Sequence, residues 1–139
     1  MIKTESQVEQ DFYDALKKTS LIGKVSGKLY KYGLRPFDSK DEDIIIRITT
    51  LNANQLQEGV ATILVFIKNI DGAEVGRMTP DKKRIAIVEG YCLECLEELK
   101  RVMEEYGNLR LETSIVSKYD AELKQSFVST RIKFSYLTI

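Results

Sequence analysis

The sequence predicts one α+β domain over residues 1–139, with a mainly antiparallel sheet of four to five strands and two helices packed on one face. Three observations support this prediction: a long segment with helical spacing, a run in which almost every residue is apolar, and several segments of alternating polarity. The coarse order is α-β-β-β-α-β-β. Two helices on one face of an antiparallel sheet would cover every apolar stripe that the sequence contains.

The longest segment with one period runs from Thr79 to Tyr106. We expect Thr79 to cap this helix and Pro80 to be its first residue, because proline has no N–H to lose there. Gly107 and Asn108 supply the stop signal. The residues at three- and four-residue steps form one apolar stripe: Ile85, Val88, Cys92, Cys95, Leu96, Leu99, Val102, Met103 and Tyr106.

A first helix is expected near the N-terminus, where Ser6 and Glu9 have the spacing of a capping box. A further turn follows and ends at Gly23. The apolar face of the first helix consists of Val8, Phe12, Ala15 and Leu16.

Residues 60–67 are apolar at almost every position and rich in β-branched side chains, which predicts a central strand buried on both faces. Residues 69–79 contain two glycines and no period, so we expect a protruding, mobile loop. The other strands are expected at residues 27–33, 44–49, 109–115 and 128–136, with a connection at 118–122.

The composition argues against an enzyme. The chain has 21 basic and 21 acidic residues, so no net charge draws it toward nucleic acid or a membrane. Histidine is absent, which removes the commonest general base and metal ligand. No phosphate-binding or nucleophile-elbow motif occurs, so we expect no cofactor and no metal. We also expect no signal peptide or membrane-spanning segment, and hence a reduced, intracellular protein.

Cys92 and Cys95 have the spacing of a redox dithiol, and a dithiol oxidoreductase is one alternative. However, Ile85 and Val88 place both cysteines on the apolar stripe of the long helix, and no proline follows Pro80. Unpaired cysteine is among the most buried residue types. We therefore expect both thiols to be structural.

Charges are segregated in the first third of the chain. The stretch 17–35 contains only basic charges, whereas residues 38–43 are mainly acidic. One interpretation is a phosphate-contacting patch, which would make the protein a small ligand- or nucleic-acid-binding module. The other, which we favour, is a solvated surface. The residues concerned are Lys17, Lys18, Lys24, Lys28, Lys31 and Arg35, followed by Asp38, Asp41, Glu42 and Asp43.

The order and spacing of these segments resemble the tail terminator, or tail completion, proteins of long-tailed phages and prophages. The likeness runs through residues 14–18, 20–22, 25–30 and 35–36, then through the long apolar strand and the core helix of the second half. It spans most of the chain. This chain has a longer second helix and a longer C-terminal strand pair than the shortest family members.

The resemblance implies a non-enzymatic virion protein that forms a ring, typically a hexamer. Such a ring would cap the tail tube and join it to the head connector, in the virion and in the host cytoplasm during assembly. The implied partners are further copies of the chain, the tail tube and the head connector, with no membrane, no specific nucleic acid and no cofactor. The interface residues expected from the segregated charges and the 69–79 loop are Lys28, Lys31, Arg35, Asp38, Asp41, Asp71, Glu74 and Arg77.

Overall fold

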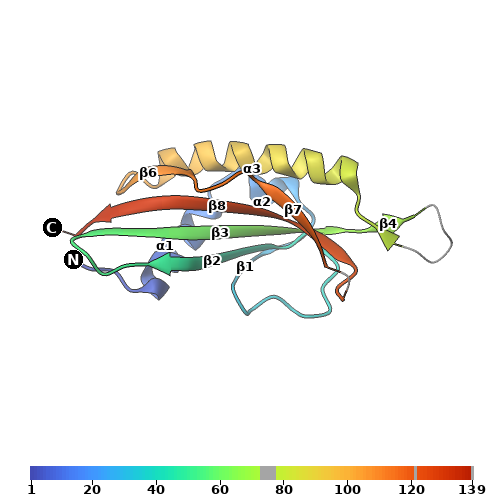
Figure 1. The fold of residues 1–139 in the computed structure, drawn as a ribbon, viewed down its shortest axis with the longest axis horizontal. Coiled ribbons are helices and arrows are strands. Elements are labelled where there is room, and N and C mark those ends of the chain that lie inside the picture. The colour runs from blue at the N-terminus through green and yellow to red at the C-terminus, as the bar shows by residue number, and fades with distance from the viewer. Residues whose placement is uncertain (73–77, 121, 139) are drawn as a thin grey trace.

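Two long strands, β3 (Leu56–Lys68) and β8 (Gln125–Leu137), form the centre of the molecule (Figure 1). They pair antiparallel over their whole length, from Leu56 opposite Leu137 to Lys68 opposite Gln125. The structure is a computed structural model that describes residues 1–72, 78–120 and 122–138. Residues 56–68 are rich in Val, Ile and Thr, whose branched side chains fit a pleated and buried surface.

The sheet has six strands in the order β1-β2-β3-β8-β6, and β7 also pairs with β8. β1 runs parallel to β2, and all other pairs in this sheet are antiparallel. The prediction of an α+β fold with a mainly antiparallel sheet is confirmed. A separate ribbon joins β4 to β5. The bounds of these strands are β1 (Leu29–Lys31), β2 (Ile44–Leu51), β4 (Ile70–Asp71), β5 (Met78–Thr79), β6 (Tyr106–Leu111) and β7 (Val116–Asp120).

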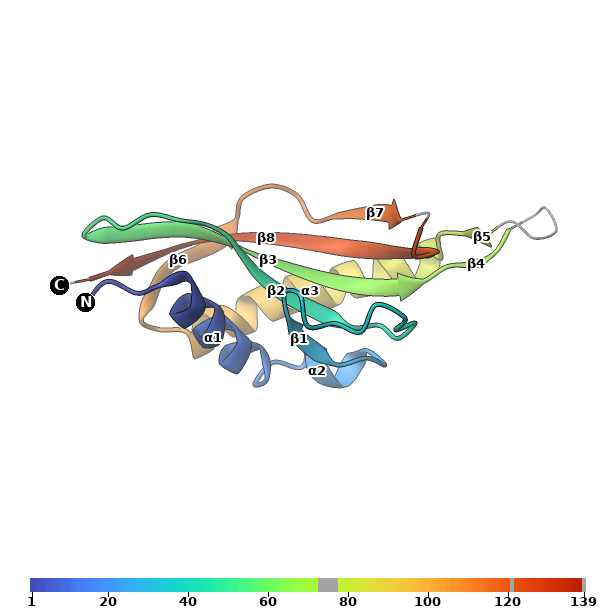
Figure 2. The ribbon, with the colours of Figure 1, turned by 90° about the horizontal axis from the view of Figure 1, so that it is seen from below.

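The helices cover one face of the sheet, which we call the helix face (Figure 2). They are α1 (Glu5–Leu16), the short α2 (Leu21–Lys24) and α3 (Lys82–Val102). Their apolar stripes pack against alternate residues of β2, β3 and β8, such as Ile63 and Val65. Each buried aliphatic side chain contributes about 1.5–3 kcal/mol relative to exposure. The buried residues of α1 and α3 are Val8, Phe12, Ala15, Leu16, Ile85, Val88, Cys92, Cys95, Leu96 and Leu99.

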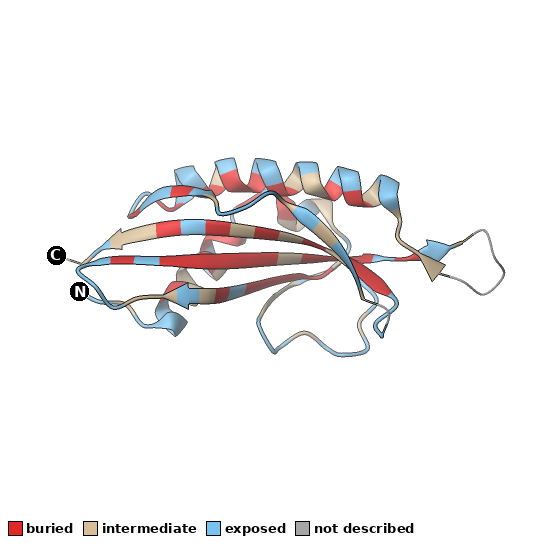
Figure 3. Ribbon diagram, viewed as in Figure 1, coloured by how far each residue is buried: buried red, intermediate tan, exposed pale blue. Residues whose placement is uncertain are grey.

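The other face of the sheet, which we call the open face, has no described helix over it, yet β3 is buried there too (Figures 2 and 3). Phe66 and Thr62 are each only 7% exposed. Thr62 pairs with Arg47 on one side and Arg131 on the other, and Arg131 forms a 2.9 Å ion pair with Glu112. The prediction that 60–67 is a central strand buried on both faces is confirmed.

The helix ends differ from the sequence prediction. Thr4, and not Ser6, caps α1, and it forms its capping box with Gln7. Asp81 caps α3 in place of Thr79, because the ribbon holds Thr79 opposite Ile70.

The long helix is also shorter at its C-terminal end than its apolar stripe predicts, because it ends at Val102. Tyr106 belongs to β6, where its hydroxyl donates to Asp11 of α1 at 2.6 Å. Its ring packs edge-on against Phe134, with the ring centres 5.6 Å apart. Tyr106 is therefore buried as expected, but as a residue of a strand and not of the helix.

Two strand assignments also change. Residues 118–120, expected in a connection, belong to β7, because β6 pairs only with the second half of β8 and leaves the first half free for β7. The described ends of the 69–79 loop form the β4–β5 ribbon, which extends beyond the sheet (Figure 1). Residues 73–77 of that loop lie outside the described residues.

Candidate interaction surface

The loop between β1 and Asp43, residues 32–42, contains several of the expected interface residues; we call it the 32–42 loop. Asp38 and Asp41 are exposed on this loop, and Asp71 is exposed on β4. Glu74 and Arg77 lie outside the described residues. Of the expected residues that the structure describes, Asp38 and Asp41 thus share the 32–42 loop, whereas Asp71 lies on a different element, the β4–β5 ribbon.

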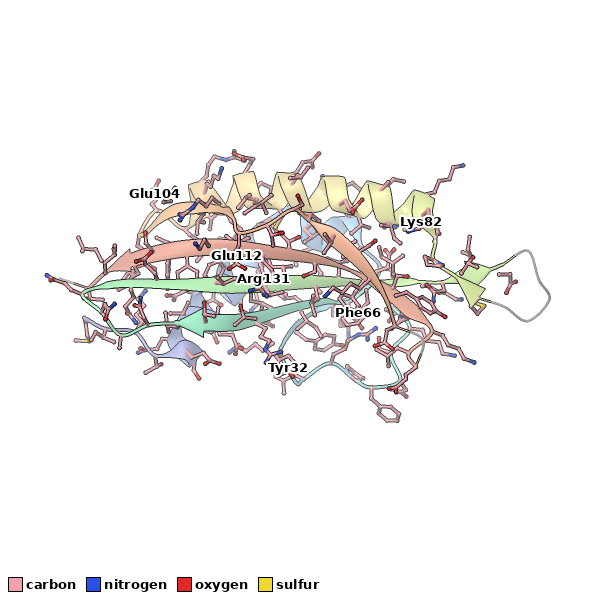
Figure 4. All side chains as sticks on the ribbon, in the orientation of Figure 1. Tyr32, Phe66, Lys82, Glu104, Glu112 and Arg131 are labelled. Atoms are coloured by element: carbon pink, nitrogen blue, oxygen red, sulfur yellow. The ribbon has the colours of Figure 1, made fainter. Side chains whose placement is uncertain are left out.

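Arg35, expected at an interface, is instead buried within the chain. Its side chain is 7% exposed, and that of Asp43 is 2% exposed. The Arg35 Nε atom donates to Asp43 Oδ2 at 2.8 Å, and Nη2 donates to Gln125 Oε1 at 3.0 Å. The guanidinium carbon lies 3.8 Å from the centre of the Phe66 ring. Arg35 thus closes the open face of the sheet over Phe66 (Figure 4 labels Phe66).

Asp43 is the acceptor around which the base of the loop is organised. Its carboxylate accepts from Ser39 Oγ and, at 2.9 Å, from the Lys28 backbone N–H. Burial alone would raise the pKa of Asp43, but these hydrogen bonds and Arg35 outweigh it and lower the pKa below the ordinary value. The backbone at Gly27 lies so close to Asp43 that a Cβ added at Gly27 would be 2.4 Å from Asp43 Oδ1. The loop is therefore fixed at its base.

A second ion pair ties the end of the loop to α3. Arg84 donates to both carboxylate oxygens of Glu42, at 2.7 and 2.8 Å, and to the Lys24 carbonyl oxygen at 3.0 Å. The hydrogen bonds from Arg84 lower the pKa of Glu42. Two parallel hydrogen bonds between a guanidinium and a carboxylate fix the relative orientation of the two side chains as well as their separation.

The tip of the loop carries apolar side chains in contact with solvent. The Ser39 N–H donates to the Pro36 carbonyl at 3.1 Å, so Phe37 and Asp38 occupy the centre of a tight turn. Phe37 is 90% exposed and Leu34 is 67% exposed. Tyr32, at the start of the loop (Figure 4), stacks on the Arg47 guanidinium at 4.1 Å. A loop with a buried ionic base and an apolar tip has the form of a contact surface.

Several cations of the basic stretch 17–35 contact other residues of the described chain. Arg35 is buried, Lys24 pairs with Glu94 at 2.5 Å, and Lys31 donates to Gln10. Lys28 is exposed, and Lys17 lies over the ring of Tyr13. Lys18 is exposed as well, so carboxylates within the described chain pair with Lys24 and Arg35, while Lys17, Lys18 and Lys28 face solvent.

A cavity of about 590 Å³ opens where the β4–β5 ribbon meets the start of α3. Asn69 lines it and is buried, and its Nδ2 atom has no hydrogen-bond partner among the described residues. The ionic groups on its wall include Arg84 and Glu42, which pair with each other. Its polar groups do not form an acid–base pair or a nucleophile with its base.

The two cysteines lie on the buried side of α3, in the core. Cys92 is 2% exposed and Cys95 is 1% exposed, and neither forms a disulfide. Burial raises the pKa of the Cys92 thiol to about 11 and that of Cys95 to about 12. Both are protonated at neutral pH, whereas a redox-active cysteine works as a thiolate. Their surroundings are those of structural residues.

Within residues 1–72, 78–120 and 122–138, no group of three metal-ligating side chains gathers around one point. None of the described helices has the length and apolar character needed to cross a membrane.

Neither the known protein families nor the curated proteins include a match to this chain.

The sequence prediction included Asp38 at the tip of the 32–42 loop but not the apolar side chains of the same loop, Leu34 and Phe37. The usable signal was the presence of Leu34 and Phe37 in a segment otherwise rich in turn and charged residues. Large apolar residues in such a segment have no strand or helix face to bury them. Nothing in the sequence indicated that Arg35 would pair with Asp43 and Gln125. These residues meet only because the folded sheet brings positions 35, 43 and 125 together.

Proposed function

We propose that this protein is a non-enzymatic assembly protein that associates with copies of itself and caps a phage or prophage tail, as the tail terminators that it resembles do. The observation that carries this proposal is the exposed Phe37 at the tip of a loop with a buried base. Large aromatic side chains are favoured at the centres of protein interfaces. Fixing such a side chain in advance lowers the entropy that association must overcome.

Two further observations agree with this function. Two of the segments that carry the resemblance, 25–30 and 35–36, lie beside or within the base of the 32–42 loop, and Arg35 is its central buried cation. Cys92 and Cys95, which the alternative of a dithiol oxidoreductase would use, are buried in the core.

The test is whether the purified protein assembles. Light scattering against concentration should show a monomer or a mixture at low micromolar concentration and a single larger particle at higher concentration. Electron microscopy should then show rings, and the protein should co-sediment with purified tail tubes. A strictly monomeric protein at millimolar concentration that ignores tail tubes would contradict the proposal.

Salt and nucleic acid separate this function from the binding-module alternative. The proposed assembly persists without nucleic acid, whereas a phosphate-binding module binds DNA or RNA with an affinity that falls steeply with salt. A titration of both nucleic acids at two salt concentrations is the measurement. Salt-sensitive binding by a protein that stays monomeric would favour the module.

A further inference from the structure

The solvent face of α3 carries apolar side chains that nothing in the described chain covers. Ile87 is 47% exposed and Leu93 is 51% exposed. With Lys83, Ala86 and Gly90 they follow one another at three- and four-residue steps, so they form one stripe opposite the buried stripe of the helix. We call these five residues the outer stripe of α3. An amphipathic surface helix normally carries polar residues there.

Gly90 lies at the centre of this outer stripe and in the middle of a helix of 21 residues. Glycine is a poor helix former, so its use there weakens the helix. The described residues give no reason for it, because a Cβ added at Gly90 would meet none of their atoms within 4 Å. A glycine flanked by exposed Ile87 and Leu93 would let another side chain approach the helix backbone closely.

The 32–42 loop and the outer stripe carry exposed side chains of complementary chemistry. Its tip presents Phe37, a large ring with no neighbour to pack on, beside the exposed carboxylates of Asp38 and Asp41. The outer stripe presents a bare backbone at Gly90 and an exposed ammonium at Lys83. An aromatic side chain beside acids on one surface thus matches an apolar stripe beside a cation on the other.

The two surfaces lie on opposite sides of the molecule. Figure 1 shows α3 along one side of the sheet and the 32–42 loop projecting from the other, and Figure 4 labels Tyr32 and Lys82, one on each. A protomer therefore cannot bring its own loop to its own α3. Contact between different patches of successive copies is heterologous, and it produces a ring or an open filament.

We propose that the 32–42 loop of one copy docks on the outer stripe of α3 of the next copy, with Phe37 placed over Gly90 between Ile87 and Leu93. This inference rests on the proposed self-association and names the two surfaces that perform it. Asp38 and Asp41 face Lys83 across the contact. The partner at this site is a second copy of the chain.

Cross-linking tests the contact directly. Phe37→Cys and Gly90→Cys are prepared as separate proteins, one with a mass tag, and are mixed with a mild oxidant. Because both substitutions remove part of the contact, the mixed disulfide should form at concentrations well above the wild-type midpoint of assembly, and neither variant alone should form a dimer. The native thiols do not compete, because Cys92 and Cys95 are buried. Dimers of Phe37→Cys alone would show a contact between like patches and overturn the proposal.

A chain that carries both new cysteines extends the test to the assembly. A ring should give a ladder of cross-linked species that ends at one closed band, and that band gives the number of subunits. A ladder without an end would show a filament built by the same contact. Absence of any cross-link in an assembled sample would overturn the proposal.

Substitutions separate this contact from general destabilisation. Gly90→Ala should raise the melting temperature, because alanine is the better helix former, and yet weaken assembly. Gly23→Ala is the matched control, since its Cβ would also meet no atom within 4 Å and it lies outside the contact. Phe37→Ala should shift the midpoint of assembly to about tenfold higher concentration or more, and Leu123→Ala should not.

The charges offer a rescue experiment. Asp41→Lys and Lys83→Glu should each weaken assembly, and the two together should restore part of it. If the wild-type protein assembles and none of these changes alters its midpoint, the proposed contact is wrong while the proposed function stands. If the wild-type protein does not assemble at any concentration or on tail tubes, both proposals are wrong.

Discussion

The two faces of the sheet are buried by different chemistry. On the helix face, aliphatic and aromatic side chains from α1 and α3 fill the space above Ile63 and Val65. On the open face, a buried ion pair between Arg35 and Asp43 closes over Phe66. One strand, β3, is thus covered on one face by packed apolar side chains and on the other by a buried ion pair.

This difference has consequences for how each face responds to change. When a hydrophobic core loses one side chain, the loss of stability grows with the cavity that remains. A buried ion pair is sensitive to loss of either partner, because the remaining charge has no solvent and no counterion. The open face also holds the 32–42 loop in place, so its network connects stability to the surface that we propose for assembly.

The largest effect is expected from removing the carboxylate at the base of the loop. Asp43→Ala leaves Arg35 buried without its partner and should cost about 3–5 kcal/mol of the free energy of unfolding. Urea denaturation followed by circular dichroism is the measurement. The control is Asp38→Ala at the exposed tip, which should change stability by less than about 0.5 kcal/mol. Equal stability of the two variants would contradict the structural role of the pair.

On the helix face, Leu99→Ala removes a fully buried side chain of α3 and should cost about 2–5 kcal/mol. The same denaturation experiment applies. Because no charge is left behind, the loop should keep its conformation, so Phe37→Cys in the Leu99→Ala background should react with maleimide as it does in the parent. Altered labelling there would show that the two faces are not independent.

Replacing both cysteines by alanine should cost about 1–3 kcal/mol for the pair and leave assembly intact. The thiols of the native protein should react with maleimide only when the protein unfolds, since burial raises the pKa of Cys92 to about 11 and that of Cys95 to about 12. Mass spectrometry with and without denaturant measures this. Fast labelling of both thiols in the native state would contradict it.

Acid should loosen the two ends of the network that holds the 32–42 loop. The folded pKa values of Asp43 and Glu42 are lowered, so both groups contribute stability that is fully present above their ordinary values of 3.8 and 4.5. That stability is lost as the pH falls through the lower, folded values. The expected loss is smaller than that of Asp43→Ala, because the side chains remain. Denaturation curves measured from pH 7 to pH 3 test this, and Glu42→Gln should flatten the dependence in part.

The smallest effect is expected at the edge of the open face. Arg47 is exposed and stacks on Tyr32, so Arg47→Ala should cost no more than about 1 kcal/mol. A loss comparable to that of Asp43→Ala would mean that the cations on this face act as one network.

The sequence alone was enough to predict the elements whose period is long and whose burial is strong. The stripe from Ile85 to Leu99 and the run 60–67 are buried as predicted, because a periodic or continuous apolar segment has few ways to leave water. The class of fold followed from them. Among the predicted interface residues, Asp38 and Asp41 are exposed, and that exposure followed from their charge.

Only the tertiary structure decided where the helices end and which charges are buried. Tyr106 continues the helical period but is buried on β6, since Phe134 and Asp11 offer it a partner there. In the sequence, Arg35 looks like one more surface cation. In the folded sheet it contacts Asp43 and Gln125, which are 8 and 90 residues away in the chain. Local spacing determines which residues avoid water, but partners far apart in the chain determine which charges can be buried, because burying a charge requires a counterion that only the completed fold supplies.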